Sequence, residues 1–272
     1  MRDYLARAIF YIQENGDELE RGRLGGLLGR DRPDPKATRA LLTRQNEDGG
    51  FPYQMAPGRP SAITSTTTAL QWLADLRALR TPHAERAVAY LLTEQRPAGS
   101  WEESPALMKF DPPPLARPGH EAGRTYSTAL SAFWLSRLLG PRHEGVQRAF
   151  AFLRRVRGDG WPEDEPIQVS SLVAALSAMV DGAASSLAAA GVEALGRRAP
   201  EAWSADRLAE VLGALYTAGL SADDTLVVWG LRRLIGLQQD GGGWSSEHGA
   251  DHDVDLSLQA LSALLAFGVP SA

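Results

Sequence analysis

The chain has 272 residues, of which 44% are hydrophobic and 22% are charged, and its formal net charge is −5. A chain of this length can bury one core, and its acidic balance argues against nucleic-acid binding, which calls for a basic stripe. It contains no cysteine, which excludes disulfides and thiolate-bound zinc.

In chain order, the first predicted element is a helical hairpin at residues 3–28, interrupted by Asn15-Gly16-Asp17. Next comes a recurring segment in which a hydrophobic helix is followed by Gln, a Gly-containing turn and an aromatic residue. The copies with Gln run from Gln45 to Phe51, from Gln95 to Trp101 and from Gln238 to Trp244. A fourth copy ends at Trp161 and has Arg155 in place of the Gln. Gly tolerates positive φ and the ring can cover the helix end, so we interpret the segment as a device that stacks repeats, with a ligand-binding turn as the alternative.

After each turn, a polar stretch leads into a second helix that is nearly free of charge. Residues 129–135 and 172–180 contain no charged residue, and a helix that is apolar on most sides is buried. The helices before the turns carry Arg and Glu on one face, which is typical of an outer layer. Residues 184–195 and 204–218 form a further hairpin without the turn. Six hairpins of about 45 residues predict an all-α fold, a single α6/α6 toroid over residues 1–272 whose first hairpin packs beside its last.

These repeats resemble those of squalene-hopene cyclases and other class II terpene cyclases, and those of the β subunits of protein prenyltransferases. Both groups are α/α toroids with Gln-to-Trp repeats, and the resemblance covers most of the chain from about Ala37 onward. The repeat motif is specific for the fold and weak for the reaction. Protein prenyltransferases hold zinc with an Asp, a Cys and a His, and this chain lacks cysteine, so the resemblance favours the cyclase branch.

The segment Asp253-Val254-Asp255-Leu256-Ser257 lies where class II terpene cyclases place an Asp-x-Asp-Asp-Thr motif, whose middle Asp protonates an alkene or epoxide. The resemblance implies that Asp255 is the catalytic acid, although Leu256 replaces the second adjacent acid. Neighbouring carboxylates disfavour a second negative charge. Asp253 and Asp251 are therefore predicted to raise the pKa of Asp255 and to keep it protonated.

Two other interpretations of this acidic segment stay open. Asp is a preferred N-cap residue, and the other inner helices also start with residues that can cap, so Asp253 or Asp255 is then simply the cap of the last helix. Alternatively, His248, Asp251 and His252 offer ligands with Asp253 for a divalent ion. Their spacing matches no pattern with a known mechanism, and we predict neither a metal site nor a cofactor.

The inner helices are predicted to run in one direction, so that their N-terminal ends meet at one mouth of the ring. Backbone N–H groups there suit a diphosphate, and the alignment of the helices on their hydroxyl residues places Thr66, Tyr126 and Val169 level with Asp255. Deeper aromatic side chains are predicted to line an apolar cavity and to stabilise a carbocation. The predicted substrate-binding residues are Thr66, Trp72, Arg124, Tyr126, Phe133 and Trp134. A long Pro-rich segment at residues 102–123 is predicted to lie over one opening.

The resemblance implies a hydrophobic, isoprenoid-type small molecule as ligand and, for an active enzyme, an isomerase or lyase. The known cyclases of this family build their active site between two toroids, whereas this chain has residues for one. A prenyl-transferring or isoprenoid-binding toroid, or a noncatalytic toroid that binds another ligand or a protein partner, is therefore the alternative. A homo-oligomer also stays open. Residues 1–29 lack a signal-peptide pattern and no apolar stretch reaches about 18 residues, so we expect a cytoplasmic protein without a transmembrane segment.

Overall fold

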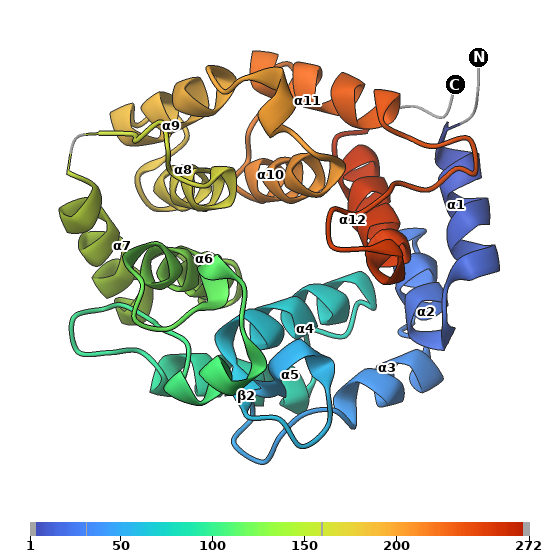
Figure 1. The fold of residues 1–272 in the computed structure, drawn as a ribbon, viewed down its shortest axis with the longest axis horizontal. Coiled ribbons are helices and arrows are strands. Elements are labelled where there is room, and N and C mark those ends of the chain that lie inside the picture. Colours follow the sequence, from blue (N-terminus) through green and yellow to red (C-terminus); the bar gives the residue numbers. More distant parts are fainter. Residues whose placement is uncertain (1–3, 31, 159, 269–272) are drawn as a thin grey trace.

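The computed structural model describes residues 4–30, 32–158 and 160–268, which form a ring of two concentric layers of helices (Figure 1). The outer helices are α1 (Tyr4–Asn15), α3 (Pro35–Leu42), α5 (Pro82–Thr93), α7 (Glu144–Arg157), α9 (Ser186–Gly196) and α11 (Thr225–Gly236). The inner helices are α2 (Glu18–Leu27), α4 (Ile63–Asp75), α6 (Glu121–Leu139), α8 (Ile167–Asp181), α10 (Ala205–Thr217) and α12 (Asp253–Ala266). The predicted all-α toroid is confirmed. No helix in the described part of the chain combines the length and apolarity needed to cross a membrane.

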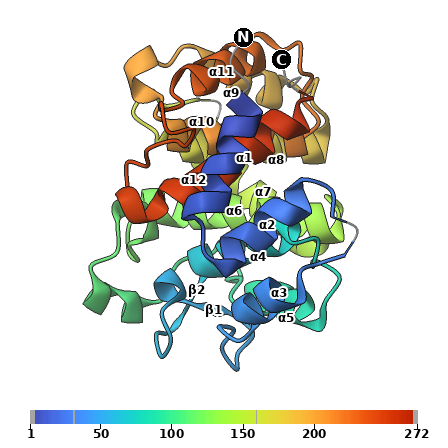
Figure 2. The ribbon, with the colours of Figure 1, turned by 90° about the vertical axis from the view of Figure 1, so that its right-hand side faces the viewer.

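The ring is closed by contacts between its first and last hairpins. Each inner helix packs against the inner helix of the next hairpin, and α12 packs against both α1 and α2 (Figures 1 and 2). A closed ring leaves neither end of the repeat stack exposed, so it needs no polar capping repeats. The predicted contact between the first and last hairpins is confirmed.

The chain turns sharply between α1 and α2 because of two local features. A Cβ atom on Gly16 would lie 2.6 Å from the carbonyl oxygen of Ile12, so this position accepts no larger residue. Asp17 then caps α2: its side chain accepts the N–H of Glu20, and the Glu20 side chain accepts the N–H of Asp17. This capping box ends one helix and starts the next within two residues.

The glutamines of the recurring segment join neighbouring hairpins. Each side-chain amide donates to a carbonyl of its own turn and to one in the first turn of the next outer helix. The acceptor pairs are Gly49 and His83 for Gln45, Gly99 and Gly145 for Gln95, and Gly242 and Tyr4 for Gln238. The last pair reaches α1 and so helps to close the ring. The interpretation of the motif as a stacking device is confirmed.

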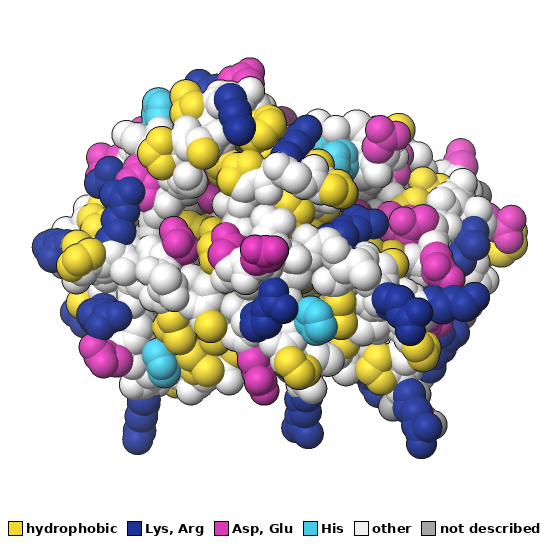
Figure 3. Space-filling model, turned by 90° about the horizontal axis from the view of Figure 1, so that it is seen from below, with side chains coloured by type: hydrophobic (Ala, Val, Ile, Leu, Met, Phe, Trp, Pro, Cys, Tyr) yellow, Lys and Arg dark blue, Asp and Glu magenta, His cyan; other side chains and the backbone are white. Residues whose placement is uncertain are grey.

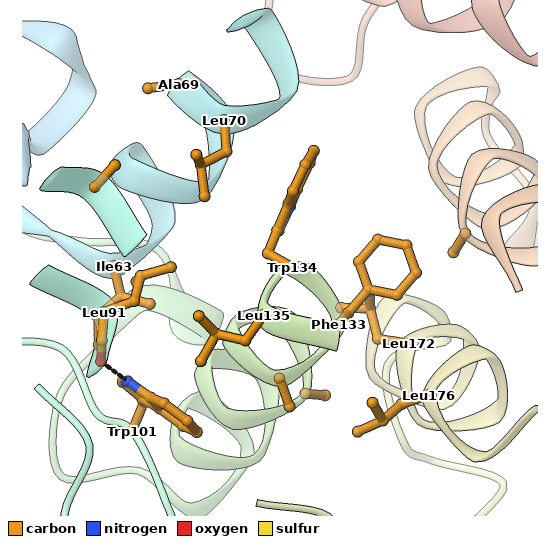
Figure 4. Close-up of a cluster of buried hydrophobic side chains, with 14 of the residues drawn as sticks. Ile63, Ala69, Leu70, Leu91, Trp101, Phe133, Trp134, Leu135, Leu172 and Leu176 are labelled. Carbon is orange, nitrogen blue, oxygen red and sulfur yellow. Dashed lines mark hydrogen bonds between the residues drawn. The ribbon is translucent and has the colours of Figure 1, made fainter. Parts of the chain in front are cut away.

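The glycine and the tryptophan of the motif complete this junction. Gly99 has φ +90°, and a Cβ atom there would lie 2.4 Å from the carbonyl oxygen of Arg148 on α7, so only Gly lets the turn approach the next helix. The indole of Trp101 is fully buried and donates to the carbonyl of Leu91 at 2.6 Å (Figure 4). Trp244 makes the same bond to Leu234 at 2.7 Å.

The fourth copy of the motif is held differently. Arg155, at the position of the Gln, is exposed. Arg157 braces this turn within its own hairpin: its Nη2 donates to both carboxylate oxygens of Glu165, and its guanidinium carbon lies 4.0 Å from the ring centroid of Trp161. The contact with the next hairpin comes from Arg198, which donates to the carbonyls of Pro162 and Glu165.

The loops before α4, α6 and α12 project from the same side of the ring (Figure 2). The first of them carries a short antiparallel pair, β1 (Phe51–Pro52) and β2 (Ser61–Ala62). The Pro-rich segment at residues 102–123 packs against this loop, where the ring of Phe110 lies tilted against that of Tyr53, with 5.9 Å between the ring centroids. Its buried Glu103 accepts the N–H groups of Ile63 and Thr64 and so caps α4 from outside. Figure 3 shows the molecule from below relative to Figure 1. On that face, acidic and basic side chains are interspersed, and neither charge forms a patch of its own.

Candidate functional site

A cavity of about 490 Å³ lies in the lumen of the ring. Asp206 and Thr217, at the two ends of α10, both line it, so it extends along most of the inner helices. His248 and His252, from the loop before α12, line its mouth, with their rings edge to face and 6.1 Å apart. The aromatic side chains in its wall are Trp72, Tyr126, Phe133, Trp134 and Tyr216.

A buried arginine occupies the junction where the ring closes. Arg23 of α2 is 1% exposed and pairs with Asp75 of α4 at 3.0 Å and with Asp255 of α12 at 2.6 Å. Its guanidinium carbon also lies 4.9 Å from the ring centroid of Trp72. Burial lowers the pKa of Arg23, but the two carboxylates outweigh burial and hold it above the ordinary value. The cluster therefore ties the first, second and last inner helices together by charge.

Asp255 is surrounded by hydrogen-bond donors. Its Oδ1 accepts from Arg23 at 2.6 Å and from the indole N–H of Trp72 at 3.2 Å, and its Oδ2 accepts from the side-chain amide of Gln259 at 2.8 Å. Donors from α2, α4 and α12 thus occupy both carboxyl oxygens of Asp255, and the side chain serves as a partner in the closure of the ring.

The other two acids of the predicted catalytic set lie away from the lumen. Asp253 accepts the N–H of Ser246 at 2.7 Å, and Asp251 is exposed in a short 3-10 helix, Ala250–His252. Neither lines the cavity within the described residues. The capping interpretation also fails, because α12 has His252 at its N-cap and no side-chain cap bond. Within the described chain, no three His, Cys, Asp or Glu side chains are placed to hold a metal ion.

A second carboxyl in the lumen has the opposite surroundings. Glu210, on α10, lines the cavity and receives the hydroxyl of Tyr126, on α6, at 3.4 Å. Burial raises the pKa of Glu210 to about 7; the Tyr126 hydrogen bond lowers it, Asp206 and Glu247 raise it, and Arg207 lowers it. Burial also raises the pKa of Tyr126. Glu210 is thus a lumen acid that carries a proton near neutral pH.

The sequence alignment of the inner helices needs one correction in register. The hydroxyl oxygens of Thr66, Thr128 and Ser257 each accept the N–H of the motif aromatic in their own hairpin, at 2.9, 3.0 and 3.1 Å. They are therefore the equivalent positions, and Thr64 stands level with Tyr126 and Asp255. Thr66 is fully buried behind the wall, whereas Thr64 lines the cavity.

Arg124 also has a different place from the one predicted. It lies 3.5 Å from Glu102 and is not among the residues that line the cavity. No residue of the segment 102–123 lines the cavity either, so this segment braces the rim and does not cover the opening. Of the six predicted substrate-binding residues, four line the cavity: Trp72, Tyr126, Phe133 and Trp134.

The cavity wall is more polar than predicted. Besides the aromatic rings, it contains four carboxyl groups and the guanidinium of Arg137, which lies over Trp134 with its carbon 4.9 Å from the ring centroid. Burial lowers the pKa of Arg137, while Asp75 raises it. The carboxyl groups in the wall belong to Asp75, Asp206, Glu210 and Asp255.

Sequence reasoning missed Arg23 and Glu210. Arg23 falls four residues after Leu19 on the buried face of α2, although charged residues also precede it on the exposed face. Glu210 stands between Ala209 and Val211 in an otherwise uncharged stretch of α10. A charge on the buried face of a helix is rare unless it is paired or functional. A charged residue on the buried face of a helix was therefore the feature by which the sequence could have identified these two residues.

The sequence matches no protein-family model and no curated protein. The structure is similar to solved toroids. A protein from Actinoplanes superposes with a TM-score of 0.63 at 18% identity, covering 98% of this chain and 99% of that one. A variant of the type II terpene cyclase MstE from Scytonema, in complex with the product merosterolic acid A, superposes with a TM-score of 0.60 at 17% identity, covering 97% and 95%. Another MstE variant, in complex with the substrate geranylgeranyl dihydroxybenzoate, gives a TM-score of 0.60 at 15% identity, covering 97% and 96%.

These similarities establish a terpene cyclase-like fold. The MstE chains are matched over nearly their whole length by this chain.

Proposed function

We propose that the protein binds a hydrophobic isoprenoid-type molecule in the lumen of its toroid and starts the cyclisation of that molecule by protonation. The observation that carries the proposal is the cavity of about 490 Å³, which combines aromatic side chains with ionisable carboxyl groups. Its volume falls within the range of about 300–1,000 Å³ that is typical of small-molecule sites. MstE, which has the same fold and extent, is described with a geranylgeranyl-bearing substrate.

The wall suits a reaction that passes through carbocations. The faces of Trp72, Tyr126, Phe133 and Trp134 attract positive charge through their ring quadrupoles. Asp255 lines the same cavity, with its carboxyl group paired with Arg23. In this scheme Asp255 acts as a fixed carboxylate and does not give up a proton.

The test is a screen of the purified protein against farnesyl and geranylgeranyl alcohols, their diphosphates, geranylgeranyl aryl ethers and the terminal epoxides of these compounds. Products are identified by gas chromatography and mass spectrometry, and binding is measured by quenching of tryptophan fluorescence. We expect a cyclic product from at least one of these substrates.

A plug in the lumen provides the matched control. Gly213 lines the cavity, and a Cβ atom there meets nothing within 4 Å, so Gly213→Phe fills the lumen without a clash near the backbone. Gly236, at the end of the outer helix α11, is equally unobstructed and lies outside the cavity. Gly213→Phe should abolish binding and turnover, whereas Gly236→Phe should keep both.

The alternative function is a noncatalytic toroid that binds an isoprenoid, another ligand or a protein partner. Binding that Gly213→Phe abolishes, without any product from the wild type, would support this alternative. If the wild type neither binds nor converts any of the compounds, the lumen is not an isoprenoid site and the proposal is wrong.

A further inference from the structure

The four carboxyl groups of the lumen differ in what holds them. Asp75 and Asp255 pair with Arg23. Asp206 accepts the hydroxyl of Ser246 at 2.7 Å and the N–H of Glu247 at 3.0 Å. In the described part of the chain, Glu210 has neither an ion pair nor a backbone donor, and its one hydrogen bond is the long one from Tyr126.

No cation forms an ion pair with Glu210 in the described part of the chain. Arg207, on the same helix, favours the charged form of Glu210 from a distance, but its guanidinium pairs with Glu247 at 3.4 Å and donates to the carbonyl of Ala202 at 2.8 Å. Glu210 therefore faces the cavity without a directly bonded positive charge. A carboxyl in such surroundings favours its neutral, protonated form.

We propose that Glu210 is the catalytic proton donor of this lumen and that Tyr126 positions it. The inference rests on the proposed cyclase function and names the acid for it. Glu210 lines the same cavity as the aromatic side chains that would stabilise the resulting cation. Tyr126 is one of these side chains and also donates a hydrogen bond to Glu210. An acid of this kind must hold its proton at the working pH, and the raised pKa of Glu210, about 7, meets that condition.

The proton transfer balances without a further reactant. The O–H bond of Glu210 breaks, and the π electron pair of the terminal double bond of the substrate forms a new C–H bond. This step leaves a tertiary cation on the neighbouring carbon and a carboxylate on Glu210. After ring closure, a C–H bond next to the last cation breaks, its electron pair forms the double bond of the product, and the proton returns to Glu210 directly or through water. On a terminal epoxide, the proton goes to the oxygen while a C–O bond breaks.

Activity should depend on pH through Glu210. The groups that face it are Tyr126 from α6, Asp206 and Arg207 from α10 itself, and Glu247 from the loop before α12. That loop also brings His248 and His252 to the cavity, and α12 brings Asp255; α8 contributes no charged side chain to the wall. We expect kcat to fall as pH rises through about 7, because Glu210 loses its proton there.

The decisive variant is Glu210→Gln, which keeps the size of the side chain and removes its transferable proton. We expect kcat to fall by about 100-fold or more, while the affinity for a bound substrate stays within about threefold. Glu193→Gln, on the exposed face of α9, is the matched control and should behave like the wild type. Infrared difference spectra of wild type against Glu210→Gln should show a protonated carboxyl that disappears around pH 7, without any need for turnover.

Tyr126→Phe tests the positioning role. The hydroxyl stabilises the ionised form of Glu210, so its loss should move the falling limb of the kcat profile to higher pH. Histidines generally change charge in the same pH range, so the limb must persist in His248→Asn/His252→Asn if it belongs to Glu210.

The outcomes separate this inference from the proposed function. If the wild type cyclises a substrate and Glu210→Gln does so equally well, the inference is overturned and the function stands. If Asp255→Asn alone abolishes turnover, Asp255 is the donor instead. If the wild type converts no substrate, the proposed function fails and the role of Glu210 fails with it.

Discussion

Two walls of the same lumen treat a carboxyl group in opposite ways. At the junction of α2, α4 and α12, Asp255 accepts hydrogen bonds from a guanidinium, an indole N–H and an amide. On α10, Glu210 meets a single hydroxyl at 3.4 Å, and burial raises its pKa to about 7. The comparison shows that the place of an acid in the repeat does not decide its chemistry. The chemistry of the acid is decided by the hydrogen-bond donors that other helices bring to it, and these donors come from far along the chain.

The largest loss of stability is expected when the positive charge of Arg23 is removed from the junction of α2, α4 and α12. Arg23→Met leaves the buried Asp75 and the partly buried Asp255 without their shared partner, so we expect a loss of about 3–5 kcal/mol in the free energy of unfolding at pH 7, measured with urea. Part of the loss should return at low pH, where the two acids become protonated. Arg21→Met is the control. It lies on the exposed side of the same helix and should cost no more than about 1 kcal/mol. Equal losses in the two variants would mean that the junction does not hold the ring closed.

Asp255→Asn is expected to come second. Asn preserves the shape of the side chain, but Arg23 then loses one of its two counter-ions. We expect a loss of about 1.5–3 kcal/mol, whereas Asp251→Asn in the exposed loop should change stability by about 0.5 kcal/mol at most. A neutral result for Asp255→Asn would return the residue to the list of candidate acids.

The sequence was sufficient for the toroid because the information that specifies it is local and repeated. A Gln six residues before an aromatic, with Gly between them, describes a turn whose bonds reach only the next hairpin. Counting hairpins then predicted closure. The register within α4 was wrong because residues 64–68 are all Ser or Thr, so several alignments on a hydroxyl were equally good.

The site was harder because its contacts are not local. Arg23 and Asp255 are 232 residues apart, and Tyr126 and Glu210 are 84 apart. No spacing rule connects such pairs, whereas the motif of the resembled family drew attention to Asp255 alone. Glu210 was visible only as a charge within an apolar helix, a signal that predicts an unusual environment without identifying the partner.

Glu210→Gln should give the third-largest change in the free energy of unfolding, and this change should stabilise the protein. Because its pKa of about 7 in the folded protein lies above the ordinary value of 4.5, ionisation of Glu210 costs the folded state stability between these pH values and the penalty is constant above them. The shift corresponds to about 3 kcal/mol at most, and since the carboxyl lines a cavity open to water, we expect about 1–2 kcal/mol. Glu210→Gln should therefore be more stable than the wild type at pH 8 and about equal to it at pH 4.5. A variant that is less stable at pH 8 would show that Glu210 is compensated by charge, like Asp255.

The smallest effect is expected for Tyr126→Phe. An O–H···O distance of 3.4 Å exceeds the usual 2.5–3.0 Å, so the bond should contribute about 0.5 kcal/mol or less at pH 8, where Glu210 is ionised. At pH 5 the neutral carboxyl is a weaker acceptor, and the difference from the wild type should shrink further. Urea unfolding at both pH values measures it. A loss above about 1.5 kcal/mol at pH 8 would mean that Tyr126 holds Glu210 as a permanent carboxylate. The two walls would then be alike, and the lumen would have no acid that keeps its proton at neutral pH.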